Sequence, residues 1–343
     1  MRKPRVSVVM PSYRHEAYIA EAIGSVLGQS VRDIELIVID DASPDGSNAV
    51  IGRFDDPRLV HIPLTSNVGA SAAMNVGLRR ARAPFIAVCN SDDAWEPDKL
   101  ERQLAILDRS PEIAAVFTDV SWVDAAGAPM DRAVPGALGN FAWENGTRHV
   151  WLKRLAEEGN CLCHPSVLLR REVYESCGAY DDYLRQLPDY DMWLRLLQKH
   201  EIHVLADRLV RFRVHDRNTS GGASEVRRRD AREGLFILRR FFEEIDAGDF
   251  AAAFLGGELS GAATAASPDP RELLRYLLAH EGHRRGLFRE IALEAIFRAP
   301  PDIRQDAMSV AAFQRAMGDA MPRPDRKRGL MSRLYGVFAS LGR

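Results

Sequence analysis

ELIVIDDASPDGS, at residues 35–47, is the stretch that decides the fold of this chain of 343 residues. An apolar run over residues 34–40 ends in paired aspartates, and a turn of Asp, Ser, Pro and Gly follows it. The run is typical of a strand that is buried on both faces, and the turn is typical of the start of a helix. A buried strand that leads directly into a helix is the repeating unit of α/β sheets. The stretch therefore predicts an α/β fold.

The same alternation of apolar runs and helical patterns continues on both sides of this stretch. It predicts a mostly parallel sheet that lies between helices, and such sheets bind ligands beyond the carboxyl ends of their strands. The predicted strands cover residues 5–10, 34–40, 59–63, 85–89 and 113–118, and the predicted helices cover residues 16–28, 70–83 and 97–108.

The second half of the chain changes character twice. Regular patterns weaken over residues 119–160, which we expect to be rich in loops, and return with a strand at 166–170 and a helix at 190–200. After residue 220, Ala, Arg, Leu and Glu recur at helical spacing, with breaks at 267–270 and 300–301. We therefore expect an α/β domain over residues 1–220 and a helical C-terminal region over residues 221–343.

Composition excludes several classes of protein. The chain is 46% apolar and 27% charged, as ordinary globular proteins are, and its net charge of −2 argues against a nucleic-acid partner. It has no apolar run long enough to span a membrane and no pattern of a signal peptide, so we expect a cytoplasmic protein. We interpret the four cysteines as buried, inert thiols: Cys89, Cys161, Cys163 and Cys177.

Acidic residues gather where predicted strands end. Asp40 and Asp41 close one strand, residues 90–93 (NSDD) follow another, and Asp189 and Asp191 open a later helix. Carboxylates at one edge of a sheet repel each other unless a cation joins them, and Mg²⁺ typically binds one or two carboxylates together with substrate phosphates. The alternative is that these acids are helix caps and turn residues. Glycine-rich dinucleotide and P-loop motifs are absent from the sequence.

Several segments together resemble family 2 glycosyltransferases of the GT-A fold. The resemblance implies a Rossmann-like catalytic domain that uses a nucleotide-diphosphate sugar and inverts the anomeric centre. It extends over about residues 5–220 and leaves out the C-terminal third. The segments that carry it are VSVVMPSY at 6–13, SVLGQS at 25–30, ELIVIDDASPDGS at 35–47, residues 67–77, NSDDAWEPDKL at 90–100, residues 164–180 and DYDMWLRL at 189–196.

The resemblance also implies which residues bind the nucleotide. Asp41 would accept a hydrogen bond from a uracil-like base, which favours UDP, and Arg79 or Arg80 would reach phosphate. Asn90 stands where the family commonly has the first Asp of its D-x-D motif, so one negative charge is missing there. The implied nucleotide-binding residues are Pro11, Tyr13, Asp41, Asn67, Gly69, Asn75, Asn90, Asp92 and Arg213.

Metal and catalytic roles follow from the same resemblance. Asp92, Asp93 and His215 would hold Mn²⁺ or Mg²⁺. Asp189 would be the general base that deprotonates the acceptor hydroxyl, with Asp191 as the fallback. Pro188 replaces the Glu that normally precedes this base.

The function that these roles imply is metal-assisted transfer of a sugar from a nucleotide-diphosphate donor, UDP-linked by this interpretation. The acceptor would be a hydroxyl of a glycan or a lipid-linked molecule in bacterial surface polysaccharide or glycoconjugate assembly. The alternative is a non-catalytic nucleotide-sugar-binding or scaffold subunit of a glycan-assembly complex, a hypothesis that Asn90 and Pro188 favour.

The C-terminal region has its own expected partners. Basic residues precede an apolar stripe over residues 323–343, a pattern that suits the surface of an anionic membrane. The other interpretation is a helix that docks on its own chain or on a second subunit. A peripheral position at the inner face of the membrane would agree with an acceptor carried on a lipid.

Overall fold

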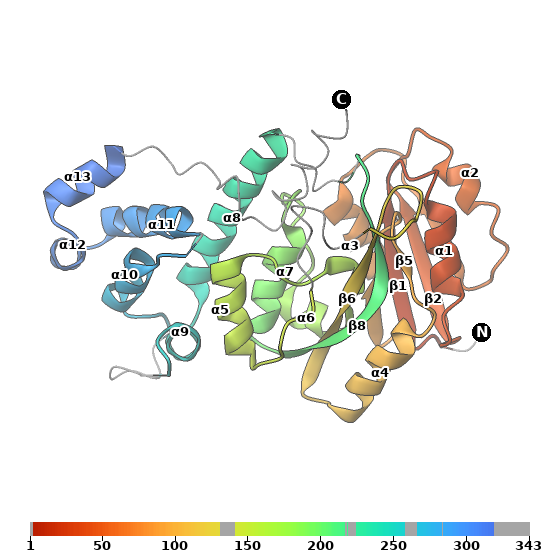
Figure 1. Cartoon of the computed structure of the whole chain (residues 1–343), viewed down its shortest axis with the longest axis horizontal. Helices are drawn as coiled ribbons and strands as arrows, with labels where there is room; N and C mark the ends of the chain where they lie inside the picture. Colours follow the sequence, from red (N-terminus) through yellow and green to blue (C-terminus); the bar gives the residue numbers. More distant parts are fainter. Residues whose placement is uncertain are drawn as a thin grey trace. The chain divides into compact units, whose positions relative to one another are not determined.

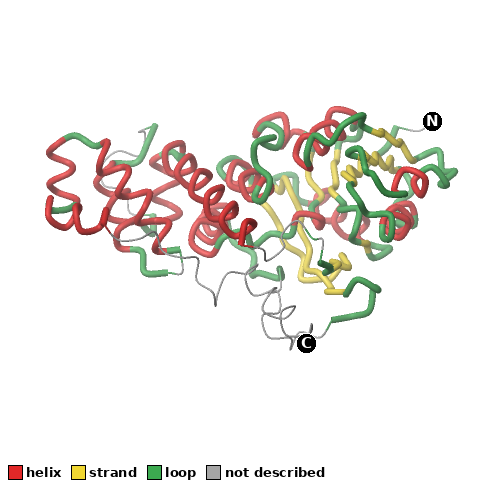
Figure 2. Tube along the Cα trace, turned by 90° about the horizontal axis from the view of Figure 1, so that it is seen from above, coloured by secondary structure: helices red, strands yellow, loops and turns green. Residues whose placement is uncertain are grey.

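The computed structural model describes residues 3–130, 141–216, 218, 224–257, 266–282 and 284–318 (Figure 1). The chain divides into two compact units. The first consists of Met1–Arg148 and Leu162–Gly221, and the second of His149–Cys161 and Gly222–Arg343. Figure 2 shows that the strands belong to the first unit, while the described part of the second unit is helical.

An eight-stranded mixed sheet forms the centre of the first unit. β1 is parallel to β2 and β4, β2 to β3, and β6 to β8, whereas β7 is antiparallel to β4 and β6 and β5 is antiparallel to β8. The strand order is β3-β2-β1-β4-β7-β6-β8-β5. The strands are β1 (Val6–Ser12), β2 (Ile34–Asp40), β3 (Leu59–Pro63), β4 (Phe85–Val88), β5 (Ala94–Trp95), β6 (Ile113–Val123), β7 (Leu168–Arg170) and β8 (Glu201–Arg213).

Helices cover both faces of this sheet. Val8 and Met10 of β1 belong to the buried cluster formed with α1 and α4 on one face. On the other face α3 lies so close that a Cβ atom at Gly77 would stand 2.3 Å from Val9 Cγ1 and 2.6 Å from Ile39 Cδ1. The helices of this unit are α1 (Ile19–Leu27), α2 (Ser47–Ile51), α3 (Ala70–Arg80), α4 (Lys99–Arg109), α6 (Glu172–Cys177) and α7 (Pro188–Leu197), and a 3₁₀ turn covers His164–Ser166.

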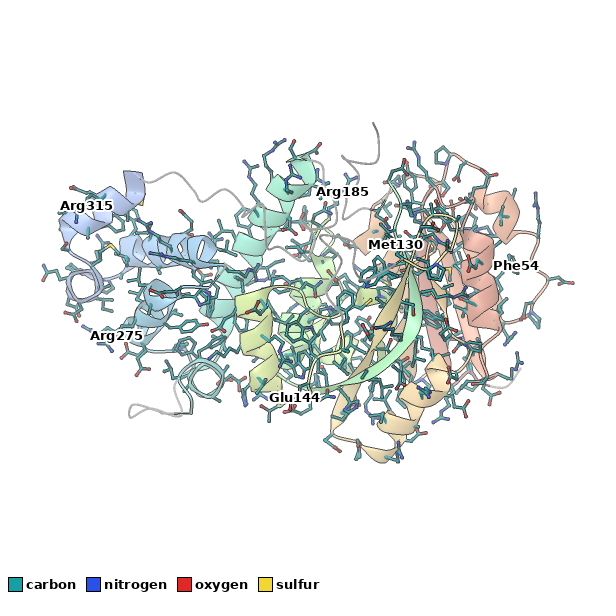
Figure 3. All side chains as sticks on the ribbon, viewed as in Figure 1. Phe54, Met130, Glu144, Arg185, Arg275 and Arg315 are labelled. Atoms are coloured by element: carbon teal, nitrogen blue, oxygen red, sulfur yellow. The ribbon has the colours of Figure 1, made fainter. Side chains whose placement is uncertain are left out.

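Most of the second unit is built from helices that the composition predicts. His149 Nε2 lies 2.8 Å from Asp249 Oδ1, and Arg284 Nη1 donates to the carbonyl oxygens of Leu155 and Ala156, so α5 packs with helices far along the chain. The helices are α5 (Arg148–Glu158), α8 (Ser224–Glu244), α9 (Ala247–Phe254), α10 (Pro270–Ala279), α11 (Arg285–Arg298), α12 (Pro301–Ala307) and α13 (Val310–Gly318). Figure 3 labels Arg275 on α10 and Arg315 on α13, and both side chains are exposed.

The core confirms several expectations. Trp193 of α7 is fully buried, with its ring edge-on to Phe117 of β6 at 4.8 Å between centroids. All four cysteines are free thiols: Cys89, Cys161 and Cys163 are buried as predicted, whereas Cys177 is only half-buried. Burial raises the pKa of Cys89 and Cys163 well above the usual value. Within the described residues, helices lack the length and apolarity that crossing a membrane requires. Residues 323–343, where we predict a membrane-surface segment, lie outside the described part of the chain.

Two elements differ from expectation. β8 was not predicted, although it is the main partner of β6 and runs parallel to it. The α5 helix lies in the range 119–160, where a loop-rich region is predicted. Both segments carry many charged residues, and their apolar positions become buried only through contact with distant parts of the chain.

Candidate functional site

Acidic and polar residues meet at the carboxyl edge of the parallel strands, as the order of the strands requires. β1 lies between β2 and β4, so the loop after β1 is a neighbour of Asp41 after β2 and of residues 90–93 after β4. The parallel register pairs Ser12 with Asp40. β8 ends at Arg213, and His215 follows it. This edge is where ligands of α/β sheets bind.

Three of these residues form a compact cluster. His215 Nε2 lies 3.1 Å from Asp92 Oδ2, and His15 Nε2 lies 3.8 Å from the same oxygen. One candidate ligand atom from each of the three lies within 4.8 Å of the other two. Tyr18 stacks on the His215 ring at 4.8 Å between centroids. The donor set of two imidazoles and one carboxylate fits a divalent metal ion.

The pKa values of Asp92 and Asp93 are shifted in opposite directions. Burial opposes ionisation of Asp92, but the hydrogen bond from His215 and the nearby His15 outweigh burial and lower the pKa of Asp92. Burial, together with the negative charge of Asp92, raises the pKa of Asp93 well above the usual range. The directions of these shifts favour Asp92 over Asp93 as the cation ligand.

Asp93 is predicted to bind metal and Arg213 to bind nucleotide, but in the structure the two residues are joined by a hydrogen bond. The Arg213 backbone N–H donates to Asp93 Oδ1 at 2.8 Å, and Asn90 Nδ2 donates to Asp93 Oδ2 at 2.9 Å. The Arg213 side chain is almost fully buried, with Nε bonded to the Asp92 carbonyl and Nη2 to Glu21 Oε2. These contacts engage both Asp93 oxygens and hold the end of β8 beside residues 90–93.

The predicted base pocket is organised by Asp41. Its two carboxylate oxygens accept from the backbone N–H groups of Val68 and Gly69 at 2.7 and 2.9 Å, and its carbonyl oxygen accepts from Asn67 Nδ2. Gly69 has a φ of +92°, a conformation that favours glycine. The structure thus brings Asp41, Asn67 and Gly69 together at the N-terminus of α3.

Pro11 and Tyr13 lie at the end of β1, on the same edge of the sheet. Pro11 is half-buried, and Tyr13 is 39% exposed, with the Arg14 guanidinium over its ring at 5.2 Å from the centroid.

Asn75 is placed elsewhere. Its Nδ2 donates to the Tyr180 carbonyl and to Asp182 Oδ1, and its Oδ1 accepts from the Tyr180 N–H. The side chain is buried and fastens the segment that precedes α7 onto α3.

Arg79 and Arg80 lie in the last turn of α3, which runs back from the ligand edge of the sheet. The chain that leaves this helix bonds to Ser7 near the start of β1. That position is at the amino edge, which argues against phosphate contacts by these arginines.

Asp189 and Asp191 lie in the first turn of α7 but have different surroundings. Asp189 is half-buried at the second helical position, after Pro188, whose fixed φ suits a helix start. Asp191 is buried and pairs with Arg195 Nη2 at 2.9 Å. His164 and Tyr180 are joined by a 2.9 Å hydrogen bond. Burial lowers the pKa of His164 and raises that of Tyr180, and the nearby charge of Asp189 acts on both as a smaller cause.

His15 is the site residue that sequence reasoning missed. It follows the first strand by three residues, and nothing in the spacing of Tyr13, Arg14 and His15 marks it as a ligand. The available signal was topological: a histidine at the carboxyl end of a strand that neighbours the strand before Asp92.

Solved structures with similar coordinates show which fold this is. S. aureus TarS in complex with UDP-GlcNAc aligns with a TM-score of 0.59 at 15% identity, covering 98% of this chain and 91% of that one. The mannosyltransferase PcManGT from Pyrobaculum calidifontis, in complex with GDP-Man and Mn²⁺, aligns with a TM-score of 0.55 at 17% identity, covering 99% and 87%. The chain spans 53% of a longer TarS chain. The fold is therefore the predicted GT-A fold of glycosyltransferases.

The family follows from the sequence comparison. Residues 7–178 match the model of glycosyl transferase family 2, so this chain belongs to that family. TuaG of Bacillus subtilis, named for teichuronic acid biosynthesis, is 39% identical over 200 residues, which are 57% of this chain and 73% of TuaG. The glycosyltransferase EpsE of the same organism is 30% identical over 201 residues, 57% and 68% of the two chains.

Proposed function

We propose that this glycosyltransferase moves a sugar from a UDP-sugar to a hydroxyl acceptor in a single displacement that inverts the anomeric centre. The observation that carries the proposal is the convergence of Asp92 and His215 at the ligand edge of the sheet. A divalent cation, Mn²⁺ or Mg²⁺, bound there would offset charge on a departing diphosphate. His215 and Asp92 would hold this ion, while Asp93 would fix Arg213 and the end of β8.

The donor side of the proposal rests on the groups around Asp41. This carboxylate would accept from the base, with Pro11, Tyr13, Asn67 and Gly69 beside it. Each carboxylate oxygen that accepts one backbone N–H retains a further lone pair for a ligand. The structure of TarS with UDP-GlcNAc supports the choice of UDP for a chain of the same fold.

The acceptor side rests on Asp189. A half-buried carboxylate in the first turn of α7 can receive the proton of an acceptor hydroxyl. The name of TuaG supports an acceptor that belongs to a surface polymer, either a glycan or a lipid-linked precursor.

A membrane position is part of this proposal. Residues 323–343 would contact anionic lipid at the inner face of the membrane, where a lipid-linked acceptor would reside. Sedimentation with phosphatidylserine vesicles should remove the full chain from solution and leave a chain ending at residue 322 behind. Equal sedimentation of the two would contradict the contact.

Calorimetry with UDP, GDP and dTDP, each with and without Mn²⁺, tests the donor site. We expect UDP to bind only with the metal, and Asp92→Ala to abolish this binding. Asp108→Ala is the matched control because Asp108 is exposed and bonds to Arg5. A folded protein that binds none of these nucleotides would contradict the proposal. A protein that binds UDP but hydrolyses no UDP-sugar in the presence of metal would be a non-catalytic scaffold.

A further inference from the structure

His15 adds a second imidazole to the Asp92–His215 pair. It comes from the loop after β1, whereas Asp92 follows β4 and His215 follows β8, so three separate elements deliver the three side chains. The two histidine rings meet edge to face, with 5.7 Å between centroids. The His15 side chain is 18% exposed, so it faces this cluster more than solvent.

The spacing of the three groups is close to that of metal ligands. Ligand atoms about 2.1 Å from one ion stand roughly 3.0–3.4 Å from each other. The candidate ligand atoms of this cluster lie within 4.8 Å of one another, and two of the pairs are separated by 3.1 and 3.8 Å. A rotation of the His15 ring would bring its ligand atom closer to those of Asp92 and His215.

Neighbouring polar groups orient both the histidine and the carboxylate. His15 Nδ1 lies 2.7 Å from Ser91 Oγ. If Nε2 uses its lone pair for a cation, Nδ1 carries the ring proton and donates a hydrogen bond to Ser91 Oγ. Metal-bound histidines are commonly held by such a hydrogen bond from the other ring nitrogen. Asn218 bonds to Asp92 Oδ2 through Nδ2 and accepts from the His215 N–H through Oδ1.

The chemistry of the donors decides which ion the cluster prefers. Mg²⁺ selects oxygen ligands and keeps several waters, whereas imidazole suits first-row transition metals. Two histidines and one carboxylate therefore favour Mn²⁺, and more strongly Co²⁺ or Zn²⁺, over Mg²⁺. Three protein ligands also leave coordination positions for phosphate oxygens.

We propose that His15 is a third protein ligand of the donor-site cation and makes the site selective for a transition metal over Mg²⁺. This inference rests on the proposed function, because it concerns the metal of that same site. Loss of His15 should leave an Asp92–His215 pair that binds Mn²⁺ and Mg²⁺ with more similar affinities.

Direct metal binding to the full chain tests the inference without an activity assay. Calorimetry gives the affinities for Mn²⁺ and Mg²⁺, and pulsed electron paramagnetic resonance of bound Mn²⁺ detects coupling to imidazole nitrogen. His15→Ala should lower the Mn²⁺ affinity by about 10–100-fold, lower the Mg²⁺ affinity by less than about threefold, and weaken the nitrogen coupling. His203→Ala, on β8 and outside the cluster, should change none of these values.

The outcomes separate this inference from the function on which it rests. If the wild type binds Mn²⁺ and UDP while folded His15→Ala keeps the Mn²⁺ affinity and the nitrogen coupling, only the role of His15 is wrong. If the wild type binds neither Mn²⁺ nor UDP, both proposals fail. His15→Asp is a second variant that exchanges nitrogen for oxygen, and it should shift the preference toward Mg²⁺. An unchanged preference in that variant would also contradict the inference.

Discussion

Two aspartates at the start of α7 show how neighbouring residues of one type take different roles. Asp191 is buried and paired with Arg195, which also donates to the carbonyl oxygens of Cys177 and Ala179. Asp189 lies one position after the helix-starting proline and is less buried. The first arrangement ties α7 to the end of α6, whereas Asp189 is only half-buried.

We expect Asp189→Asn and Asp191→Asn to separate activity from stability. Asp189→Asn should lower the rate of sugar transfer by about 10²–10⁴-fold, because it removes a general base, with a smaller effect on folding. Asp191→Asn should lower the free energy of unfolding by about 2 kcal/mol, because it leaves Arg195 partly unpaired. Transfer assays and urea denaturation of both variants measure the two effects. The reverse pattern would assign the base to Asp191.

Lys99 is a fully buried lysine outside the candidate site. Its ammonium nitrogen lies 3.9 Å from the centre of the Trp95 ring and 2.9 Å from Gln103 Oε1. Gln103 in turn donates to the carbonyl oxygens of Val116 and Ser166, so this lysine supports the contact of α4 with the sheet. Burial lowers the pKa of Lys99 to about 7.

This pKa predicts a pH-dependent stability. Between pH 7 and about 10.4, unfolded Lys99 binds a proton that the folded chain has released, so its contribution to stability rises with pH. The difference in free energy of unfolding between wild type and Lys99→Met should grow by about 1.4 kcal/mol per pH unit from pH 7.5 to 9.5, in favour of the wild type. Urea denaturation measures it, with Lys153→Met on the exposed side of α5 as the control. If the free energies of unfolding of wild type and Lys99→Met changed equally with pH, the lowered pKa of Lys99 would be wrong.

At the scale of elements, the closest contact between a helix and the sheet depends on Gly77. A methyl group there would overlap side chains of β1 and β2. Gly24 of α1 is the natural comparison, because a Cβ at that position would meet nothing within 4 Å. One glycine allows α3 to approach the sheet, and the other is an exposed helical position.

Alanine at these two glycines should have opposite effects. Gly77→Ala should lower the free energy of unfolding by about 1–3 kcal/mol through overpacking. Gly24→Ala should raise it by up to about 1 kcal/mol, because alanine favours a helix more than glycine does. Urea denaturation at one pH compares both variants with the wild type. Equal changes of the same sign would mean that α3 can move away from the sheet at little cost.

The elements also show how far the sequence determines the fold. β2 and β3 have the predicted bounds, because each is a dense apolar run closed by a turn. β8 was missed because Ala206, Asp207 and Arg208 interrupt its alternation with exposed positions, next to the irregular register between Asp119 and Arg208. Its identity as a strand comes from pairing with β6, which local sequence does not encode.

Part of the candidate site was also predictable from the sequence. Asp92 and His215 were expected as ligands from the resemblance, and the structure brings them together. His15 was not expected, and Asn75 and Arg213 are engaged in contacts within the protein. These differences depend on side-chain direction and on which loops become neighbours, and both follow from the order of strands in the sheet.

At the scale of the whole molecule, the two units are not consecutive in the chain. α5 belongs with the later helices except for its first residue, although residues on both sides of it belong to the sheet unit. The change in composition near residue 220 predicts a boundary there. No local property of residues 148–158 indicates which helices α5 joins.

A chain cut after Gly221 should therefore fold poorly. Its α5 helix would lose the helices that bond to His149, Glu157 and the carbonyl of Leu155. We expect the fragment to bind a hydrophobic dye and to melt below the full chain. A monomeric fragment as stable as the full chain would show that α5 does not need the second unit.

This order of the two units along the chain also delays the packing of α5 during synthesis. The partners of α5 at Asp249, Tyr276 and Arg284 follow it by 100, 119 and 129 residues. At about 5–20 residues per second, the ribosome delivers them roughly 5–26 s after α5. Throughout that interval the buried positions of α5 lack the later helices to which this helix bonds. Chaperone binding to nascent chains should therefore concentrate on residues 148–158 and end once translation has passed α11.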